Sequence, residues 1–129
     1  MNAGNTKTVL ICDNEARVRQ ALKALLLARE VPGEKSASPA IQVVGEACHG
    51  SDAVRMVELL QPEVVLMDAS MPGISGIEAA RLIKRKWPNV RIVMLTMYPD
   101  TRTEAADAGV DAFLLKGCLA ETLFDAILT

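Results

Sequence analysis

Five short runs of apolar residues recur along the chain, and longer stretches between them repeat their apolar residues every three or four positions. The runs span residues 8–12, 41–45, 64–67, 91–95 and 112–115. Four of them are almost continuously apolar, which is typical of parallel strands buried on both faces. The run at 41–45 is more polar, and this favours an edge strand.

The stretches between the runs predict helices at 15–29, 52–60, 76–86, 100–108 and 119–128. Ser51 and Ser75 precede two of them as expected N-caps, and Gly109 follows the fourth as a stop signal. The basic residues at 84–86 are expected to form a solvated helix end, where cations suit the helix dipole. Five strand-then-helix units in a row predict an α/β fold: a doubly wound five-stranded parallel sheet with helices on both faces.

Composition narrows the class of protein. A length of 129 residues predicts one domain, and the 50% apolar and 23% charged content excludes a disordered chain. Residues 31–40 interrupt the pattern with Pro, Gly and Ser, which indicates an exposed loop insertion. The net charge of −2 argues against a nucleic-acid surface on this domain, and no apolar run is long enough for a membrane span. Without a secretion signal or a C-x-x-C pair, we expect a cytoplasmic domain.

The single histidine limits the available chemistry. His49 is the only one in the chain, and the three cysteines show no paired spacing. A Ser-His-Asp triad and a clustered His/Cys zinc site are therefore not expected.

Polar residues follow four of the five apolar runs. Asp13-Asn14-Glu15 follow the first, and Asp68, Thr96 and Lys116 follow the third, fourth and fifth. Ligands of parallel sheets bind beyond the carboxyl ends of the strands, so these groups should converge. Clustered carboxylates suit Mg²⁺, while a lysine and a threonine can hold phosphoryl oxygens and an aspartate can act as nucleophile. The alternative is that Asp13 and Asp68 only cap the loops that follow them.

Two segments at these positions resemble the receiver domain of two-component response regulators, and the resemblance covers essentially the whole chain. The first is VLICDNE at Val9–Glu15, and the second is VVLMDASMPGISG at Val64–Gly76. The M-D-x-x-M-P-G-x-x-G string and the ending Leu-Leu-Lys-Gly are most similar to LuxR/NarL-type receivers, whose output domain is a helix-turn-helix. The fold implied is flavodoxin-like, with strand order 2-1-3-4-5 and residues 1–129 as one receiver domain.

The resemblance also implies roles for individual residues. Asp68 would accept a phosphoryl group from a sensor histidine kinase, and Lys116 would pair with the phosphoryl oxygens. Asp13, Asp68 and the backbone carbonyl of Ser70 would hold Mg²⁺. Thr96 would turn its hydroxyl toward the phosphate, so that Phe113 swings inward. Such a domain is not an enzyme beyond its own phosphorylation and dephosphorylation.

Departures from the family pattern leave some alternatives open. Asn14 stands where the family usually has a second acid, so its part in binding the metal, and phosphorylation itself, stay open. A phosphorylation-independent protein-interaction module is therefore the alternative function. A hydrolytic phosphotransferase is disfavoured, because Ser70 stands where such enzymes need a second aspartate. The segment from Thr96 to Lys116 is about two residues short, which predicts a short fourth helix.

Partners follow from the same resemblance. DNA would be reached only through an output domain that this chain does not contain, and no membrane partner is expected. Whether the domain forms a homodimer stays open.

Overall fold

The computed structural model describes residues 6–28 and 40–129, so nearly all of the predicted loop at 31–40 lies outside the described residues. Strands and helices alternate along the described chain. In order they are β1 (Thr6–Cys12), α1 (Ala16–Leu27), β2 (Ala40–Ala47), α2 (Gly50–Leu60), β3 (Val64–Asp68), α3 (Gly76–Lys86), β4 (Arg91–Thr96), α4 (Arg102–Asp107), β5 (Ala112–Leu115) and α5 (Ala120–Leu128). None of the described helices is long and apolar enough to cross a membrane.

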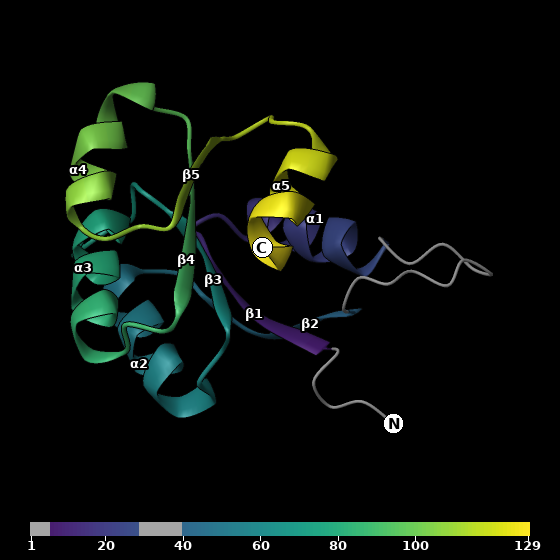
Figure 1. Ribbon diagram of the computed structural model, residues 1–129, viewed down its shortest axis with the longest axis horizontal. Coiled ribbons are helices and arrows are strands. Elements are labelled where there is room, and N and C mark those ends of the chain that lie inside the picture. The colour runs from purple at the N-terminus through teal and green to yellow at the C-terminus, as the bar shows by residue number, and fades with distance from the viewer. Residues whose placement is uncertain (1–5, 29–39) are drawn as a thin grey trace.

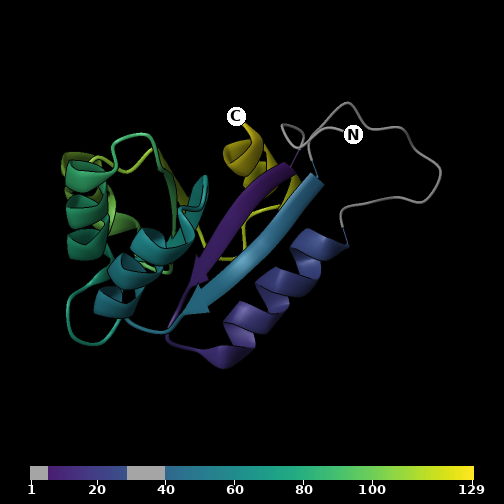
Figure 2. The same ribbon diagram turned by 90° about the horizontal axis from the view of Figure 1, so that it is seen from below.

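The strands form one parallel sheet in the order β2-β1-β3-β4-β5. Helices α1 and α5 cover one face, and α2, α3 and α4 cover the other (Figure 1; Figure 2). This is the doubly wound arrangement that the sequence pattern predicts. Each crossover returns the chain to a parallel neighbour, so all five strands point their carboxyl ends toward the same edge.

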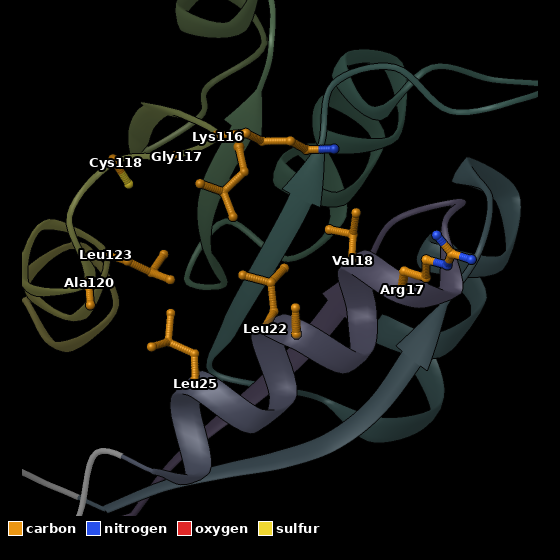
Figure 3. Close-up of a pocket in the computed structure, with 11 residues that line it drawn as sticks. Arg17, Val18, Leu22, Leu25, Lys116, Gly117, Cys118, Ala120 and Leu123 are labelled. Carbon is orange, nitrogen blue, oxygen red and sulfur yellow. The ribbon is translucent and has the colours of Figure 1, made fainter.

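Alternate residues of the central strands feed two separate cores. Val9, Ile11 and Leu66 face α1 and α5, where Leu22 and Leu25 point toward Leu123 (Figure 3). A hollow of about 420 Å³ lies between these two helices.

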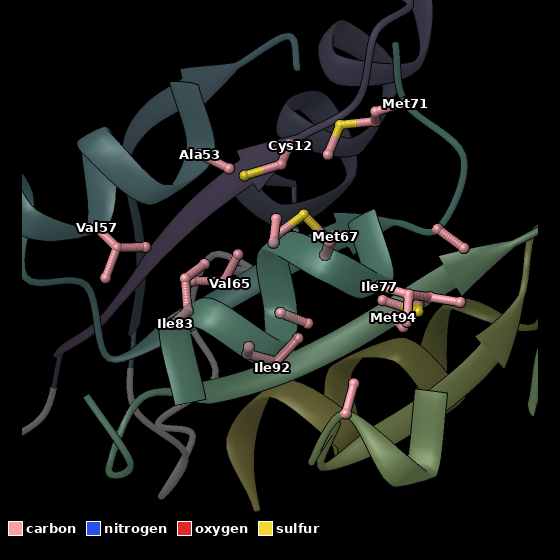
Figure 4. Close-up of a cluster of buried hydrophobic side chains, with 14 of the residues drawn as sticks. Cys12, Ala53, Val57, Val65, Met67, Met71, Ile77, Ile83, Ile92 and Met94 are labelled. Atoms are coloured by element: carbon pink, nitrogen blue, oxygen red, sulfur yellow. The ribbon is translucent and has the colours of Figure 1, made fainter. Parts of the chain in front are cut away.

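The opposite core is built against α2, α3 and α4. Cys12 of β1 points toward Ala53 of α2, and Met67 and Met94 lie near Ile77 (Figure 4). Burial raises the pKa of the Cys12 thiol well above its usual range. Cys12 is therefore a small packing residue, as expected.

Of the two edge strands, only β5 differs from what its apolar pattern suggests. β2 lies at an edge, as its polar pattern predicts, but β5 lies at the other edge although its run is continuously apolar. Ala112, Phe113 and Leu114 are only half-buried, and Leu115 is 41% exposed. The continuous apolar run at 112–115 correctly predicts a strand. It suggests burial on both faces, but β5 has only one neighbouring strand and its residues are less covered than those of the central strands.

The start of α2 is not where the sequence pattern places it. The N-cap is His49 instead of Ser51, and its Nδ1 accepts a hydrogen bond from the Asp52 backbone N–H at 3.2 Å. Gly50 is required there, because a Cβ at this position would lie 2.3 Å from the Ile74 carbonyl oxygen. The first turn of α2 therefore packs directly on the loop between β3 and α3.

The other helix limits agree more closely with the sequence pattern. The expected cap of α3 is confirmed, since Ser75 Oγ accepts a hydrogen bond from the Glu78 backbone N–H at 3.1 Å. A 3₁₀ turn at Pro99–Thr101 precedes the six-residue α4. The fourth helix is short, as the shortened segment predicts.

Lys84 is not part of a solvated helix end. Its ammonium donates to the carbonyl oxygens of Pro88 and Val90, at 3.0 and 2.9 Å, and to Asp111 Oδ2 at 3.0 Å. Its side chain is only 18% exposed. Asp111 Oδ2 also accepts a hydrogen bond from the Ile92 backbone N–H at 2.8 Å. One lysine thus connects the end of α3 to the beginnings of β4 and β5.

Replacing Lys84 should destabilise the fold. Lys84→Met keeps the apolar stem but takes the ammonium donor from two carbonyl oxygens and leaves Asp111 Oδ2 with only the Ile92 N–H, so we expect the free energy of unfolding to fall by about 1–3 kcal/mol. Lys86→Met is the matched control, since its exposed ion pair with Glu58 should contribute less than about 1 kcal/mol. Urea denaturation measures both variants, and equal losses would show that Lys84 has no special role.

Candidate functional site

Four of the predicted site residues come together at the carboxyl edge of the sheet. Asp13 follows β1, Asp68 and Thr96 are the last residues of β3 and β4, and Lys116 follows β5. The Lys116 ammonium lies 2.9 Å from Asp13 Oδ2 and 3.5 Å from Asp68 Oδ1. Lys116 therefore reaches past the end of β4 to contact carboxylates from two other strands.

Backbone hydrogen bonds just beyond the strands hold these side chains in place. The Asp13 N–H donates to the Ala47 carbonyl at 3.0 Å, and the Lys116 N–H donates to the Thr96 carbonyl at 2.8 Å. Both bonds continue a parallel ladder by one residue. The functional side chains are thus fixed by the sheet, although two of them lie outside it.

The site has buried charge. Asp13 is 2% exposed, Asp68 is 7% exposed and Thr96 is fully buried. Burial and the nearby Asp13 charge raise the pKa of the Asp68 carboxyl, and Lys116 only partly opposes them. Burial also disfavours the Lys116 ammonium, but its hydrogen bond to Asp13 and the charge of Asp68 raise its pKa overall.

The donor set fits a divalent cation. Two carboxylates face one ammonium, which leaves one uncompensated negative charge when both acids are ionised. Oxygen ligands are what Mg²⁺ prefers, and it retains several waters in such sites. Asp13 and Asp68 would supply the charged ligands.

The two remaining predicted ligands lie in the adjoining loops, and both are exposed. Asn14 follows Asp13 directly. Ser70 donates its backbone N–H toward Asp68 Oδ1 at 3.4 Å. Metal binding by Asn14 and by the Ser70 carbonyl stays a prediction.

Thr96 and Phe113 occupy neighbouring strands. Thr96 Oγ1 accepts a hydrogen bond from the Tyr98 backbone N–H at 3.0 Å, which leaves its hydroxyl proton free to be donated. Phe113 packs against the core that α2, α3 and α4 cover. The Arg102 guanidinium lies 4.7 Å from the centre of the Phe113 ring, a cation–π contact. Sequence reasoning missed Arg102, because nothing in its local pattern indicates a partner on the next strand.

Comparison with known proteins places this geometry in a family. A sequence model described as the response regulator receiver domain matches residues 9–128. The chain belongs to the response regulator receiver family. LiaR of Bacillus subtilis, a transcriptional regulatory protein, is 38% identical over 121 residues, which are 92% of this chain and 53% of LiaR. The response regulator UvrY of Escherichia coli K12 is also 38% identical, over 92% of this chain and 51% of UvrY. The receiver thus spans about half the length of these curated relatives.

Solved structures agree with the sequence comparison. A LuxR-family two-component response regulator from Aurantimonas sp. SI85-9A1 superposes with a TM-score of 0.83 and 29% identity, covering 95% of this chain and 82% of that one. The signal receiver domain of NarL from Mycobacterium tuberculosis gives a TM-score of 0.81 and 25% identity, covering 95% and 94%. The predicted LuxR/NarL likeness and the flavodoxin-like receiver fold are confirmed.

The receiver has a second cluster that sequence reasoning did not anticipate. Cys48, His49 and Asp52 place their potential ligand atoms within 4.8 Å of one another. A single histidine does not favour a His/Cys site, but Asp52 in the first turn of α2 can supply a third ligand. The spacing C-H-x-x-D was the available signal.

The charged site also borders the hollow between α1 and α5. Val18, Ala21 and Leu95 contribute to its apolar lining, together with Cys118. Lys116 lies at its edge but directs its ammonium away from Leu22 and Leu25 (Figure 3). An apolar surface therefore adjoins the charged site.

Removing the acid at position 68 should stabilise the metal-free receiver. A raised pKa means that ionised Asp68 destabilises the folded state, so Asp68→Asn should raise the free energy of unfolding at neutral pH. The gain should shrink as the pH falls through the raised pKa, and vanish below the ordinary value of 3.8, because the wild-type carboxyl is then neutral as well.

Thermal melts in a chelator across this pH range measure the difference. Asp107→Asn serves as the control, since Asp107 is exposed on α4 and should have little effect. A stability gain that does not change with pH would contradict the electrostatic explanation.

Proposed function

We propose that this receiver accepts a phosphoryl group on Asp68 from a sensor histidine kinase, with Mg²⁺ bound by Asp13 and Asp68. The contact of Lys116 with both buried carboxylates carries the proposal. It brings together a nucleophile, a second acid and a cation in one buried cluster. The proposal extends the family assignment to the particular residues of this chain.

The chemistry is a phosphoryl transfer between two side chains. An Asp68 carboxylate oxygen forms a bond to phosphorus, while the bond between phosphorus and the donor histidine nitrogen breaks and the nitrogen keeps the electron pair. Bound Mg²⁺ would neutralise charge on the phosphoryl oxygens. Lys116, already 3.5 Å from Asp68, would then pair with one of these oxygens.

Transmission of the signal would begin at Thr96. Its hydroxyl accepts from Tyr98 and can still donate, so a phosphoryl oxygen nearby would offer it a new acceptor. A shift of Thr96 would change the space available to Phe113 on the neighbouring strand. Phe113 contacts Arg102 at the first turn of α4, so we expect α4 to carry the change to the surface.

The output and partners belong to the proposal as well. Residues 1–129 would act as one receiver domain whose output is a DNA-binding domain, because the LuxR-type relatives are about twice as long. DNA contact would occur only through that domain, and a homodimer is a further expected assembly. The receiver itself would have no activity beyond forming and losing its own aspartyl phosphate.

One observation favours a second candidate, a phosphorylation-independent interaction module. The hollow between α1 and α5 offers an apolar surface while Asp68 is unmodified. Asn14 also carries no charge, which weakens the expected metal site. A phosphodonor assay separates the two functions.

Acetyl phosphate or phosphoramidate with Mg²⁺ should add one phosphoryl group to the receiver. Intact-mass measurement should detect it, and hydroxylamine should remove it, because an acyl phosphate reacts with this nucleophile. Asp68→Asn should abolish the modification, since an amide is not a competent nucleophile, whereas Asp107→Asn should retain it. Modification that persists in Asp68→Asn would place the acceptor elsewhere.

Restoring an acid at position 14 should strengthen metal binding. Asn14→Asp adds a negative charge beside Asp13, but repulsion among three acids opposes the gain, so we expect Mg²⁺ to bind about ten-fold more tightly. Asn89→Asp adds the same charge in the loop before β4, at the other end of the sheet, and should leave the affinity unchanged. Calorimetric titration compares the two, and equal Mg²⁺ affinities would show that residue 14 does not face the metal.

A further inference from the structure

Cys48, His49 and Asp52 form a cluster of three different metal-ligating groups at the junction of β2 and α2. Their potential ligand atoms all lie within 4.8 Å of one another. Cys48 and His49 are exposed and Asp52 is half-buried, so an ion from solution can reach all three. The cluster shares no residue with the acidic site at the carboxyl edge of the sheet.

The ligand types select the metal. A thiolate, an imidazole and a carboxylate are ligands of Zn²⁺, which takes them at about 2.0–2.3 Å in a tetrahedral arrangement. Such bond lengths place neighbouring ligand atoms about 3–4 Å apart, so small side-chain rotations would bring this cluster into range. Mg²⁺ prefers oxygen ligands only and would not compete here.

Charge at this helix start also favours binding. Asp52 is kept ionised, because a hydrogen bond from Arg55 lowers the pKa of its carboxyl and the Cys48 backbone N–H adds to the effect. The positive end of the α2 dipole favours an anionic ligand such as the Asp52 carboxylate. A Cys48 thiolate and the Asp52 carboxylate would together offset the two charges of a bound ion, while Arg55 stays paired with Asp52.

The His49 ring is already held in the cluster. Its Nδ1 accepts from the Asp52 backbone N–H and lies 3.1 Å from Ser51 Oγ. With the metal on Nε2, the ring proton would move to Nδ1 and donate to Ser51 Oγ, as a ligating histidine commonly does toward a neighbouring oxygen. The cap hydrogen bond from the Asp52 N–H would then be lost, which makes metal binding and helix capping alternatives for this ring.

From this convergence we propose that Cys48, His49 and Asp52 bind one Zn²⁺ ion, with water completing its coordination. Binding releases the thiol proton of Cys48 to solvent and forms one bond from each of the three side chains to the ion. The site is separate from the proposed Mg²⁺ site, and it does not depend on phosphorylation of Asp68.

The test uses Co²⁺ as a spectroscopic substitute for Zn²⁺ on the reduced full chain, with excess Mg²⁺ present to occupy the acidic site. We expect one equivalent of Co²⁺ to produce a thiolate-to-cobalt charge-transfer band in the near ultraviolet, and Zn²⁺ to displace it. Cys48→Ser should abolish this band. Cys118→Ser is the matched control and should leave it unchanged, because Cys118 is partly exposed but lies elsewhere, beside the hollow between α1 and α5.

A second variant separates metal binding from helix capping. His49→Asn keeps a favoured N-cap residue but removes the imidazole, so α2 should remain folded by circular dichroism. Its Zn²⁺ affinity should fall by more than the roughly 10- to 100-fold that loss of an outer-shell partner can cause. The proposal is overturned if no charge-transfer band forms, if the band survives Cys48→Ser, or if His49→Asn binds Zn²⁺ as tightly as the wild type does.

Discussion

A single ammonium shared between two buried carboxylates organises the functional edge of this receiver. Lys116 contacts Asp13 and Asp68, and neither acid has room to keep a full water shell. Without the lysine, two like charges would face each other in a poorly solvated position, which proteins avoid by protonation or by binding a cation. With both acids ionised, the cluster still carries one excess negative charge. This excess charge suits the Mg²⁺ ion and the phosphorylation of Asp68 that we propose.

Most of the fold was predictable from the sequence, because strands buried on both faces leave an unmistakable apolar pattern. The positions of Asp13, Asp68, Thr96 and Lys116 at one edge followed from the parallel sheet alone, since every strand end lies there. The edge position of β5 agrees with the strand order that the receiver resemblance implied, but it did not follow from the apolar run itself, because such a run records the propensity to form a strand and not the number of its neighbours. The roles of Asn14 and Ser70 at the site are still predictions, since side-chain and carbonyl ligation depends on an ion that the sequence cannot position.

Side chains that bridge distant segments were the least predictable features. Lys84 belongs by sequence to a basic helix end, yet its ammonium is taken up by two carbonyls and Asp111. His49 caps α2 although serine and aspartate neighbours are better cap formers, because Gly50 must lie against Ile74 and this sets where the helix begins. Arg102, the first residue of α4, places its guanidinium over the ring of Phe113 in β5. In each case a tertiary contact determines a role that local propensity leaves open.

The pairing of Asp13 with Lys116 has a consequence for how the protein is made. These two residues are 103 positions apart in the chain, so their contact closes a loop that contains most of the domain. Contacts of such long range form only after the intervening strands have paired, because the loop entropy must first be overcome. A nascent chain that still lacks β5 would carry Asp68 without its lysine. Readiness to receive a signal would therefore be one of the last properties that this domain acquires as it folds.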